Sequence, residues 1–305
     1  LVTVRRAQEA NQAHTPRWEA ASGTELKAVD ASTCAARLWL ALAEMAEALG
    51  YGEEAEEWHA LRRRSAEALE RLWDEEAGIY RDLDPATGRL TEVASSAGFR
   101  PLLTDVPDPE RVRRLLAHLE PGGAFATPFP VPSLATDDPR FDAEGFWRGR
   151  RRERPFNGRV WPTITCQLLE GLVRQWHRGI AEAGVTAARI LPAFVRMMHG
   201  PEDASRPNAW EHYNPRTGRP SRFRGLDDHQ RSWVLDLILR CVAGVEPGPD
   251  ALRIHPLPLA LRSVELEAEV RGRPLRLTLS GESVEVSLGG ERVRGTVGEP
   301  LEIPW

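Results

Sequence analysis

The hydrophobic pattern of this chain changes its period once, near residue 256, and that change limits the folds the chain can adopt. Before this point, apolar residues recur with the spacing of amphipathic helices, as at Leu38, Leu42, Met45 and Leu49. After it, apolar and polar residues alternate strictly over 264–270, 275–279 and 284–288, with glycine-containing turns between these segments. We therefore predict a mainly α protein, with helical hairpins over residues 1–250 and a small antiparallel β unit over residues 251–305.

The helical part divides at glycine and proline residues. Gly50 should separate two helices of an antiparallel hairpin, and Pro162 suits the first turn of a later helix. A short extended piece is expected at 78–82. Further helices are expected near 95–103, 108–119, 184–199 and 228–243.

Composition argues against several classes of protein. The chain has 305 residues, 41% of them hydrophobic, with a net charge of −5, and its one basic run, 148–154, is short enough for a solvated loop. Apolar runs fall short of the roughly 18 residues of a membrane span, and no signal peptide opens the sequence. Cys34, Cys166 and Cys241 lie far apart without metal-ligand spacing, which is typical of buried free thiols in a reducing compartment. We expect a soluble cytoplasmic protein with no metal or cofactor and no nucleic-acid or membrane partner.

One carboxylate stands among aromatic residues in the segment 208–232. Glu211 lies between Trp210 and His212, and Tyr213 and an Asn-Pro-Arg-Thr-Gly turn follow it. Aromatic faces stack on sugar rings, and a carboxylate beside them can activate a water, which is the combination that sugar hydrolysis needs. The alternative is an ordinary loop residue. The enzymatic interpretation requires this carboxylate to face a sugar-sized hollow and not to be locked in a buried ion pair.

A long loop, 121–159, is rich in proline, glycine and aromatic residues, and loops of this length are commonly functional. The tryptophans in and around these segments are candidate sugar platforms, with core packing as the alternative. The arginines could bind hydroxyls or an acidic aglycone such as a glycerate, or pair with nearby carboxylates. The candidate substrate-binding residues are Trp147, Arg148, Asn157, Arg159, Trp161, Trp210, Tyr213 and Gln230.

Four segments together resemble the (α/α)6-barrel glycoside hydrolases of family 63 and the related bacterial mannosylglycerate and glucosylglycerate hydrolases. They are a proline-rich loop, Thr127 to Ser133 with Asp137-Asp138-Pro139; a sugar-lining loop, Phe146-Trp147-Arg148-Gly149 and Pro155 to Pro162; Glu211-His212-Tyr213-Asn214-Pro215 with Thr217-Gly218; and Arg224 to Trp233, where the last barrel helix begins. The resemblance implies an inverting hydrolysis of α-linked glucosides or mannosides. It also implies that the partner is a small oligosaccharide or a glycosylated small molecule.

The resemblance assigns the general base to Glu211 and locates a departure at the general acid. The family's acid segment corresponds to residues 9–18, in which Glu9, Pro16, Arg17 and Trp18 fit, but the acid position is Ala13. A methyl group cannot protonate a glycosidic oxygen, and general acid catalysis is typically worth about 10²–10⁴-fold. His14 is adjacent, but its side chain should point elsewhere. We therefore expect impaired hydrolysis; the alternatives are a non-catalytic carbohydrate-binding remnant and a ligand-free helical scaffold.

The helical segments are also fewer than a complete toroid of this kind requires. The family has helices before the acid segment, whereas here that segment lies close to residue 1. We expect a toroid that is incomplete at its N-terminal side, with apolar helical faces left exposed. Such faces promote self-association.

Overall fold

The computed structural model describes residues 1–5, 12, 14–200, 209–221, 233–259 and 263–305. Its helices are α1 (Val29–Ala48), α2 (Gly52–Glu70), α3 (Pro109–Ala117), α4 (Pro162–His177), α5 (Ala181–His199) and α6 (Trp233–Leu237). Short 3-10 helices, η1 (Pro16–Trp18) and η2 (Ser96–Leu103), and a π-helical segment, η3 (Ile238–Val242), complete the helical elements of the described ranges. The predicted helical pieces are therefore confirmed, except that residues 228–232 of the last one lie outside the described residues.

Most strands before residue 245 are short pairs that hold loops together. They are β1 (Thr3–Val4), β2 (Leu26–Lys27), β3 (Trp73–Asp74), β4 (Ile79–Tyr80), β5 (Leu83–Asp84), β6 (Arg89–Leu90), β7 (Phe146–Trp147) and β8 (Arg150–Arg151). The order β1-β2-β5-β6 forms one small sheet, and β3 with β4 and β7 with β8 form two hairpins. The sheet ties the N-terminal segment to the chain around residue 84.

The C-terminal unit consists of two antiparallel sheets. Its strands are β9 (Val245–Pro247), β10 (Ala251–Ile254), β11 (Ser263–Val270), β12 (Arg273–Ser280), β13 (Ser283–Leu288), β14 (Glu291–Thr296) and β15 (Leu301–Pro304). A meander, β11-β12-β13-β14, contains the three predicted alternating segments, and β15-β10-β9 forms the second sheet. Leu277 pairs with Leu266 on one side and Val286 on the other, so one face of the meander is apolar.

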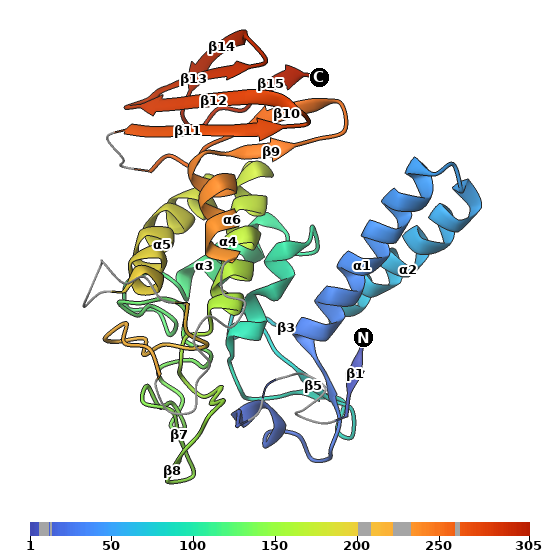
Figure 1. The fold of residues 1–305 in the computed structure, drawn as a ribbon. Coiled ribbons are helices and arrows are strands. Elements are labelled where there is room, and N and C mark those ends of the chain that lie inside the picture. The colour runs from blue at the N-terminus through green and yellow to red at the C-terminus, as the bar shows by residue number, and fades with distance from the viewer. Residues whose placement is uncertain (6–11, 13, 201–208, 222–232, 260–262) are drawn as a thin grey trace.

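Two groups of buried apolar side chains fill the interior. The larger one includes residues of α3, α4 and α5 and of the loops around Val131 and Val160. The smaller one lies within the β unit and includes Leu277 and Ile303. Figure 1 shows the β unit at one end of α4 and α6, and the loops that carry β7 and β8 at the opposite end. The division at residue 250 stays a prediction.

The hairpin of α1 and α2 extends away from the remaining helices (Figure 1). Leu38 and Met45 of α1 and Leu49 directly after it expose 51%, 61% and 69% of their surface, as expected for an apolar face that the described residues do not cover. Cys34 is exposed on the same helix, so the prediction that all three thiols are buried is wrong for this one. The helical period around it is as predicted, but the face on which it lies is not covered. Self-association through this hairpin stays a prediction.

Within the described ranges, each helix is too short or too polar to cross a bilayer.

Candidate active site

Three loops distant in sequence meet through single backbone pairings. Val160 and Tyr213 exchange two hydrogen bonds, each with an N···O distance of 2.9 Å. Pro132 pairs with Val160 on one side, and Pro220 pairs with Tyr213 on the other. Val160 therefore lies between the proline-rich loop and the segment that carries Glu211, and the backbone N–H of Phe129 also donates to the Pro215 carbonyl at 3.0 Å.

A five-residue turn holds the chain directly after Glu211. The Asn214 side-chain oxygen accepts hydrogen bonds from the backbone N–H groups of Arg216 and Thr217, at 2.8 and 3.1 Å. Gly218 donates to the Asn214 carbonyl at 2.9 Å, with a φ of 70° that favours glycine. Because this turn is closed by its own residues, it fixes the direction of the strand segment that precedes it.

The same turn occurs earlier in the chain. Asp84 accepts from the backbone N–H of Ala86 at 2.9 Å, and Gly88, at a φ of 68°, donates to the Asp84 carbonyl at 2.8 Å. The two Pro-x-Thr-Gly-Arg sequences therefore have the same local structure, which their shared spacing predicts.

Glu211 is buried, with 4% of its surface exposed. Its Oε1 lies 3.4 Å from the Arg154 Nε, and the two side chains are 5% and 47% exposed, respectively. The pair is therefore open on the arginine side, where the guanidinium reaches solvent. Because the Arg154 side chain is half-exposed, it can move away from Glu211 without disturbing the core.

His212 fixes the orientation of the segment from the other side. Its Nδ1 accepts a hydrogen bond from the Arg159 Nε at 3.0 Å, because a guanidinium only donates. Its Nε2 therefore carries the proton and donates to the Glu153 carbonyl at 2.9 Å. The ring is buried and held at both nitrogens, so it acts as a fixed link between loop 121–159 and Glu211.

The segment that carries the acid position is anchored by Arg17. Ala13 itself lies outside the described residues, but Gln12 and His14 on either side are described. The Arg17 Nη1 donates to the Gln12 side-chain oxygen at 2.6 Å, and the Trp18 indole donates to the Gln12 carbonyl at 3.2 Å. The His14 carbonyl accepts from the backbone N–H of Phe156 at 3.2 Å. This last bond joins the segment to loop 121–159.

A series of contacts then runs from His14 to the neighbour of Glu211. Phe156 stacks on Trp161 with ring centroids 3.9 Å apart and planes 8° apart. Trp161 in turn lies 5.0 Å from the His212 ring. The segment that carries position 13 and the segment that carries Glu211 therefore belong to one packed region. Two groups that must flank the same sugar would need this arrangement.

Trp147, Arg148 and Asn157 lie on or beside the β7–β8 hairpin. Trp147 is 9% exposed, and the Arg148 guanidinium lies 6.0 Å from its ring centroid. Arg148 is exposed and also pairs with Glu19. The Asn157 amide donates to the carbonyls of Arg140 and Phe146, and its side-chain oxygen is buried without a hydrogen-bond partner among the described residues. Their roles in substrate binding stay predictions.

Arg159, Trp161 and Tyr213 are buried, and each makes internal hydrogen bonds. Arg159 donates to the Ala143 carbonyl at 2.9 Å, and burial lowers its pKa to about 10, so it remains charged at neutral pH. The Trp161 indole donates to the Pro155 carbonyl at 3.0 Å. The Tyr213 hydroxyl accepts from the backbone N–H of Trp210 at 2.8 Å. Direct contacts of these side chains with a substrate stay predictions.

Trp210 is half-buried against the core, whereas Gln230 lies outside the described residues. His14 is half-buried, and desolvation, together with Arg152, lowers its pKa below the usual value. The protonated form of His14 is therefore less populated at neutral pH than that of an ordinary histidine. Within the described ranges, no cluster of three or more His, Cys, Asp or Glu side chains is arranged to hold a metal ion.

Sequence reasoning missed two residues of this region. Arg154 belongs to the basic run that was interpreted as a solvated loop, and its alternation with glutamate gave no sign of a partner at residue 211. Arg17 was quoted only as part of a motif, although it is 1% exposed and contacts both Asp30 and Asp82. Its position between a proline and a tryptophan was the available indication that this arginine is buried.

The paired loops, the buried carboxylate and the stacked rings lie together below the helical hairpins, and the comparison with known families gives the class of protein to which they belong. The family model for the mannosylglycerate hydrolase MGH1-like glycoside hydrolase domain matches residues 2–233. The chain belongs to this family.

Relatives and solved structures agree with this assignment. A mannosylglycerate hydrolase of Rubrobacter radiotolerans is 31% identical over 203 residues, which are 66% of this chain and 40% of the relative. The crystal structure of the GH63 mannosylglycerate hydrolase from Thermus thermophilus in complex with glucose matches with a TM-score of 0.55 and 27% identity. That match covers 70% of this chain and 45% of the other. The present chain thus spans less than half the length of these proteins.

A sialidase structure also matches, with a TM-score of 0.80, over 97% of this chain and 28% of the sialidase. The two sequences are 15% identical, so this likeness concerns the fold alone. These structures confirm the predicted fold class, helical hairpins of the (α/α)6-toroid type with a C-terminal β unit.

Proposed function

We propose that this chain supplies the general base, Glu211, of an inverting glycosidase site. The substrate of this site is an α-linked glucoside or mannoside. The contact series from His14 through Phe156, Trp161 and His212 supports this proposal most strongly. It joins the acid segment to the base segment within one region. In this proposal the glycosylated substrate is a small molecule such as mannosylglycerate.

In the proposed reaction, Arg154 moves into solvent and a water takes its place beside Glu211. The carboxylate removes a proton from that water as the water attacks the anomeric carbon from the face opposite the leaving group. Inverting enzymes keep the two carboxyls about 6.5–9.5 Å apart so that the water fits between base and sugar. Burial of Glu211 excludes other waters from competing for the same position.

The departing oxygen lacks its proton donor in this chain, because position 13 is alanine. Hydrolysis should therefore be slow for substrates whose leaving group is a poor one, such as a glycerate hydroxyl. A substrate whose leaving group departs without protonation should not suffer this loss of rate. For this reason we propose an impaired enzyme rather than one with full turnover.

Replacing Ala13 with aspartate tests the proposal directly. We expect A13D to raise kcat/KM on mannosylglycerate or glucosylglycerate by about 10²–10⁴-fold, the usual worth of a general acid. A13N has nearly the same shape but no acidic proton, and it should leave the rate unchanged. Adding E211Q to A13D should abolish the gain. An A13D variant that folds, binds sugar and shows no increase would contradict the catalytic proposal.

A second substrate separates a damaged enzyme from a binding remnant. The α-glucosyl and α-mannosyl fluorides need no protonation of their leaving group, so the unmodified chain should hydrolyse one of them faster than the natural glycosides. Proton NMR of the first product should show the inverted, β anomer. Sugar binding by calorimetry without turnover of either fluoride favours the carbohydrate-binding remnant, for which the alanine at position 13 is the specific observation.

A further inference from the structure

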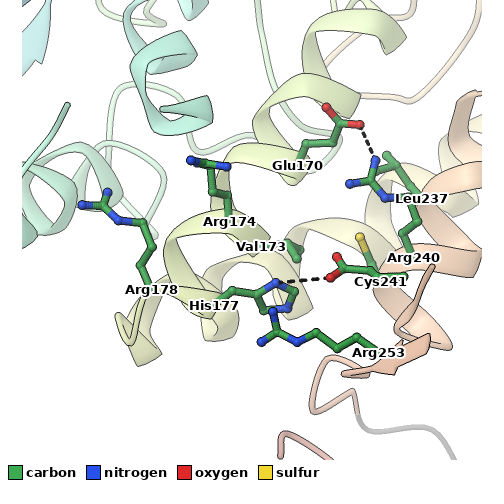
Figure 2. Close-up of a pocket in the computed structure, with 10 residues that line it drawn as sticks. Glu170, Val173, Arg174, His177, Arg178, Leu237, Arg240, Cys241 and Arg253 are labelled. Carbon is green, nitrogen blue, oxygen red and sulfur yellow. Dashed lines mark hydrogen bonds and ion pairs between the residues drawn. The ribbon is translucent and has the colours of Figure 1, made fainter. Parts of the chain in front are cut away.

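A cavity lies between the helices and the β unit, and Glu211 is not among the residues that line it. It has a volume of about 340 Å³, within the range of small-molecule pockets. Its walls come from α4, from the end of α6 with η3, and from β9 and β10. Figure 2 shows the side chains that line it.

Arginines dominate the charge of this cavity. Arg174 and Arg178 come from α4 and the residue that follows it, Arg240 comes from η3, and Arg253 comes from β10. Two glutamates also line the cavity, so the guanidinium groups exceed the carboxylates by two. Arg240 pairs with Glu170 at 2.8 Å, which leaves the other arginines to set the local potential.

Two buried nitrogens in this wall have no hydrogen-bond partner within the described part of the chain. They are the Arg253 Nε and the His177 Nε2. The Arg253 guanidinium lies beside the His177 ring in Figure 2, and its Nη2 is 3.2 Å from the His255 Nδ1. Buried polar atoms are nearly always hydrogen-bonded, so two such atoms among the residues that line one cavity indicate a place for an acceptor.

The glutamate next to these nitrogens does not satisfy them. The Glu246 Oε2 lies 3.9 Å from the His177 Nδ1, which is beyond hydrogen-bond distance. This oxygen therefore faces Nδ1 and not Nε2, the ring nitrogen that lacks a partner among the described residues. Burial, with His255 and Arg253 adding to it, lowers the pKa of His177 to about 4. The ring is therefore neutral at neutral pH, and one tautomer presents an Nε2–H to an incoming acceptor.

We propose that this cavity binds a phosphate dianion, either free or as the monoester of a small molecule. Guanidinium groups match the geometry of phosphate oxygens and remain charged when buried. Arg174 and His177 lie three residues apart at the end of α4, so they can approach one ligand together, whereas the Arg178 guanidinium donates to the Gln175 side chain at 2.7 Å and adds only its charge. The excess of two positive charges matches the charge of the ligand, and Arg253 supplies the buried donor.

Calorimetric titration with inorganic phosphate tests the site. Each titration is run at constant ionic strength, with chloride as the reference anion, because screening alone would act on both. We expect saturable phosphate binding that chloride does not reproduce. R253Q should weaken it by about 10–100-fold, the loss expected when a charge-assisted hydrogen bond is removed. R64Q removes the same charge from the exposed face of α2 and should leave the affinity unchanged.

Weaker phosphate binding in R253Q could also result from a folding defect, so a second variant is needed for which tighter binding is expected. Glu246 lines the cavity with a charge that repels a bound dianion, so E246Q should bind phosphate more tightly than the unmodified chain. Phenyl phosphate as a second titrant distinguishes the two sources: tighter binding than inorganic phosphate indicates a monoester site, and weaker binding indicates free phosphate. Equal affinity for phosphate in R253Q and R64Q, or no binding beyond that of chloride, would overturn the proposal.

Discussion

Arg17 shows how a single buried charge can organise the region around the acid position. Its guanidinium donates to Asp82 at 2.7 and 2.8 Å and to Asp30 at 2.9 and 3.0 Å. Burial opposes the charge on Arg17, but the two carboxylates outweigh it and raise its pKa well above the usual value. Burial likewise opposes ionisation of Asp30, but Arg17 outweighs it and lowers the Asp30 pKa to about 2. Arg17 and Asp30 are therefore ionised together.

Removing the central charge should cost much more than removing a surface arginine. R17M would remove the cation that Asp30 and Asp82 share, and breaking a buried pair in this way costs about 3–5 kcal/mol. Urea denaturation should show this loss in the free energy of unfolding. R64M, on the exposed face of α2, should change it by no more than about 0.5 kcal/mol. Similar midpoints for the two variants would show that Arg17 is not needed to hold this region.

No local pattern in the sequence could have paired these residues. Asp82 is 65 residues from Arg17 and also accepts from the backbone N–H of Val29 at the start of α1. Such a contact depends on the sheet that joins β2 to β5, which brings both segments together. The resemblance identified the arginine as part of a motif, but only the fold identifies its partners.

At the scale of elements, the turn after Glu211 depends on a glycine in two ways. Gly218 has a positive φ, and a Cβ built on it would lie 2.7 Å from the Cζ of Phe129, in the proline-rich loop. Gly88 occupies the same position in the matching turn, with a φ of 68° but nothing within 4 Å of a Cβ. A side chain at either position would therefore meet backbone strain, but only a side chain at residue 218 would also meet a close neighbour.

Alanine at each position should distinguish these contributions. G88A should cost about 1–3 kcal/mol, the usual penalty for a left-handed backbone at a residue other than glycine. G218A carries the same penalty and a further cost of about 1–3 kcal/mol, because the methyl group displaces the Phe129 ring. Chemical denaturation of both variants measures the difference. Equal losses would show that the turn and the proline-rich loop are not tightly packed.

Elements were predictable where their signals are local. The Pro-x-Thr-Gly turns, the helix that begins at Pro162 and the alternating strands of the meander all follow from residues within a few positions of one another. The pairing of Val160 with Tyr213 could not be predicted, because neither lies in an alternating segment and each forms only an isolated bridge. The same applies to β15, a four-residue strand that pairs with β10 after a return of the chain.

At the scale of the whole molecule, a stack of rings joins the helices to the β unit. Trp176 and His177 end α4, and His255 follows β10. The His255 ring lies 4.0 Å from the Trp176 ring and 4.4 Å from the His177 ring, and its Nε2 interacts with the Gly298 carbonyl at 3.0 Å. Burial lowers the pKa of both histidines, to about 4 for His177.

These shifts make stability depend on pH in a defined direction. A histidine of the unfolded chain takes up a proton near pH 6.5, whereas His177 in the folded protein does so near pH 4. Between these values the unfolded state binds more protons, so the free energy of unfolding falls as pH drops from about 6.5 to about 4. Above pH 6.5 the two states bind equally few, and this contribution is fully present.

His177→Phe keeps a ring in the stack but removes the titrating group. The melting temperature of this variant, measured in phosphate-free buffers at about pH 7.5 and pH 5, on either side of the unfolded-state pKa, should therefore fall less on acidification than that of the unmodified chain. His199→Phe, at the exposed C-terminal end of α5, should keep the full pH dependence. Carboxylates that titrate near pH 4 contribute to all three proteins alike, so the difference between them isolates His177. If His177→Phe loses as much stability on acidification as His199→Phe, protonation at the junction does not loosen the β unit from the helices.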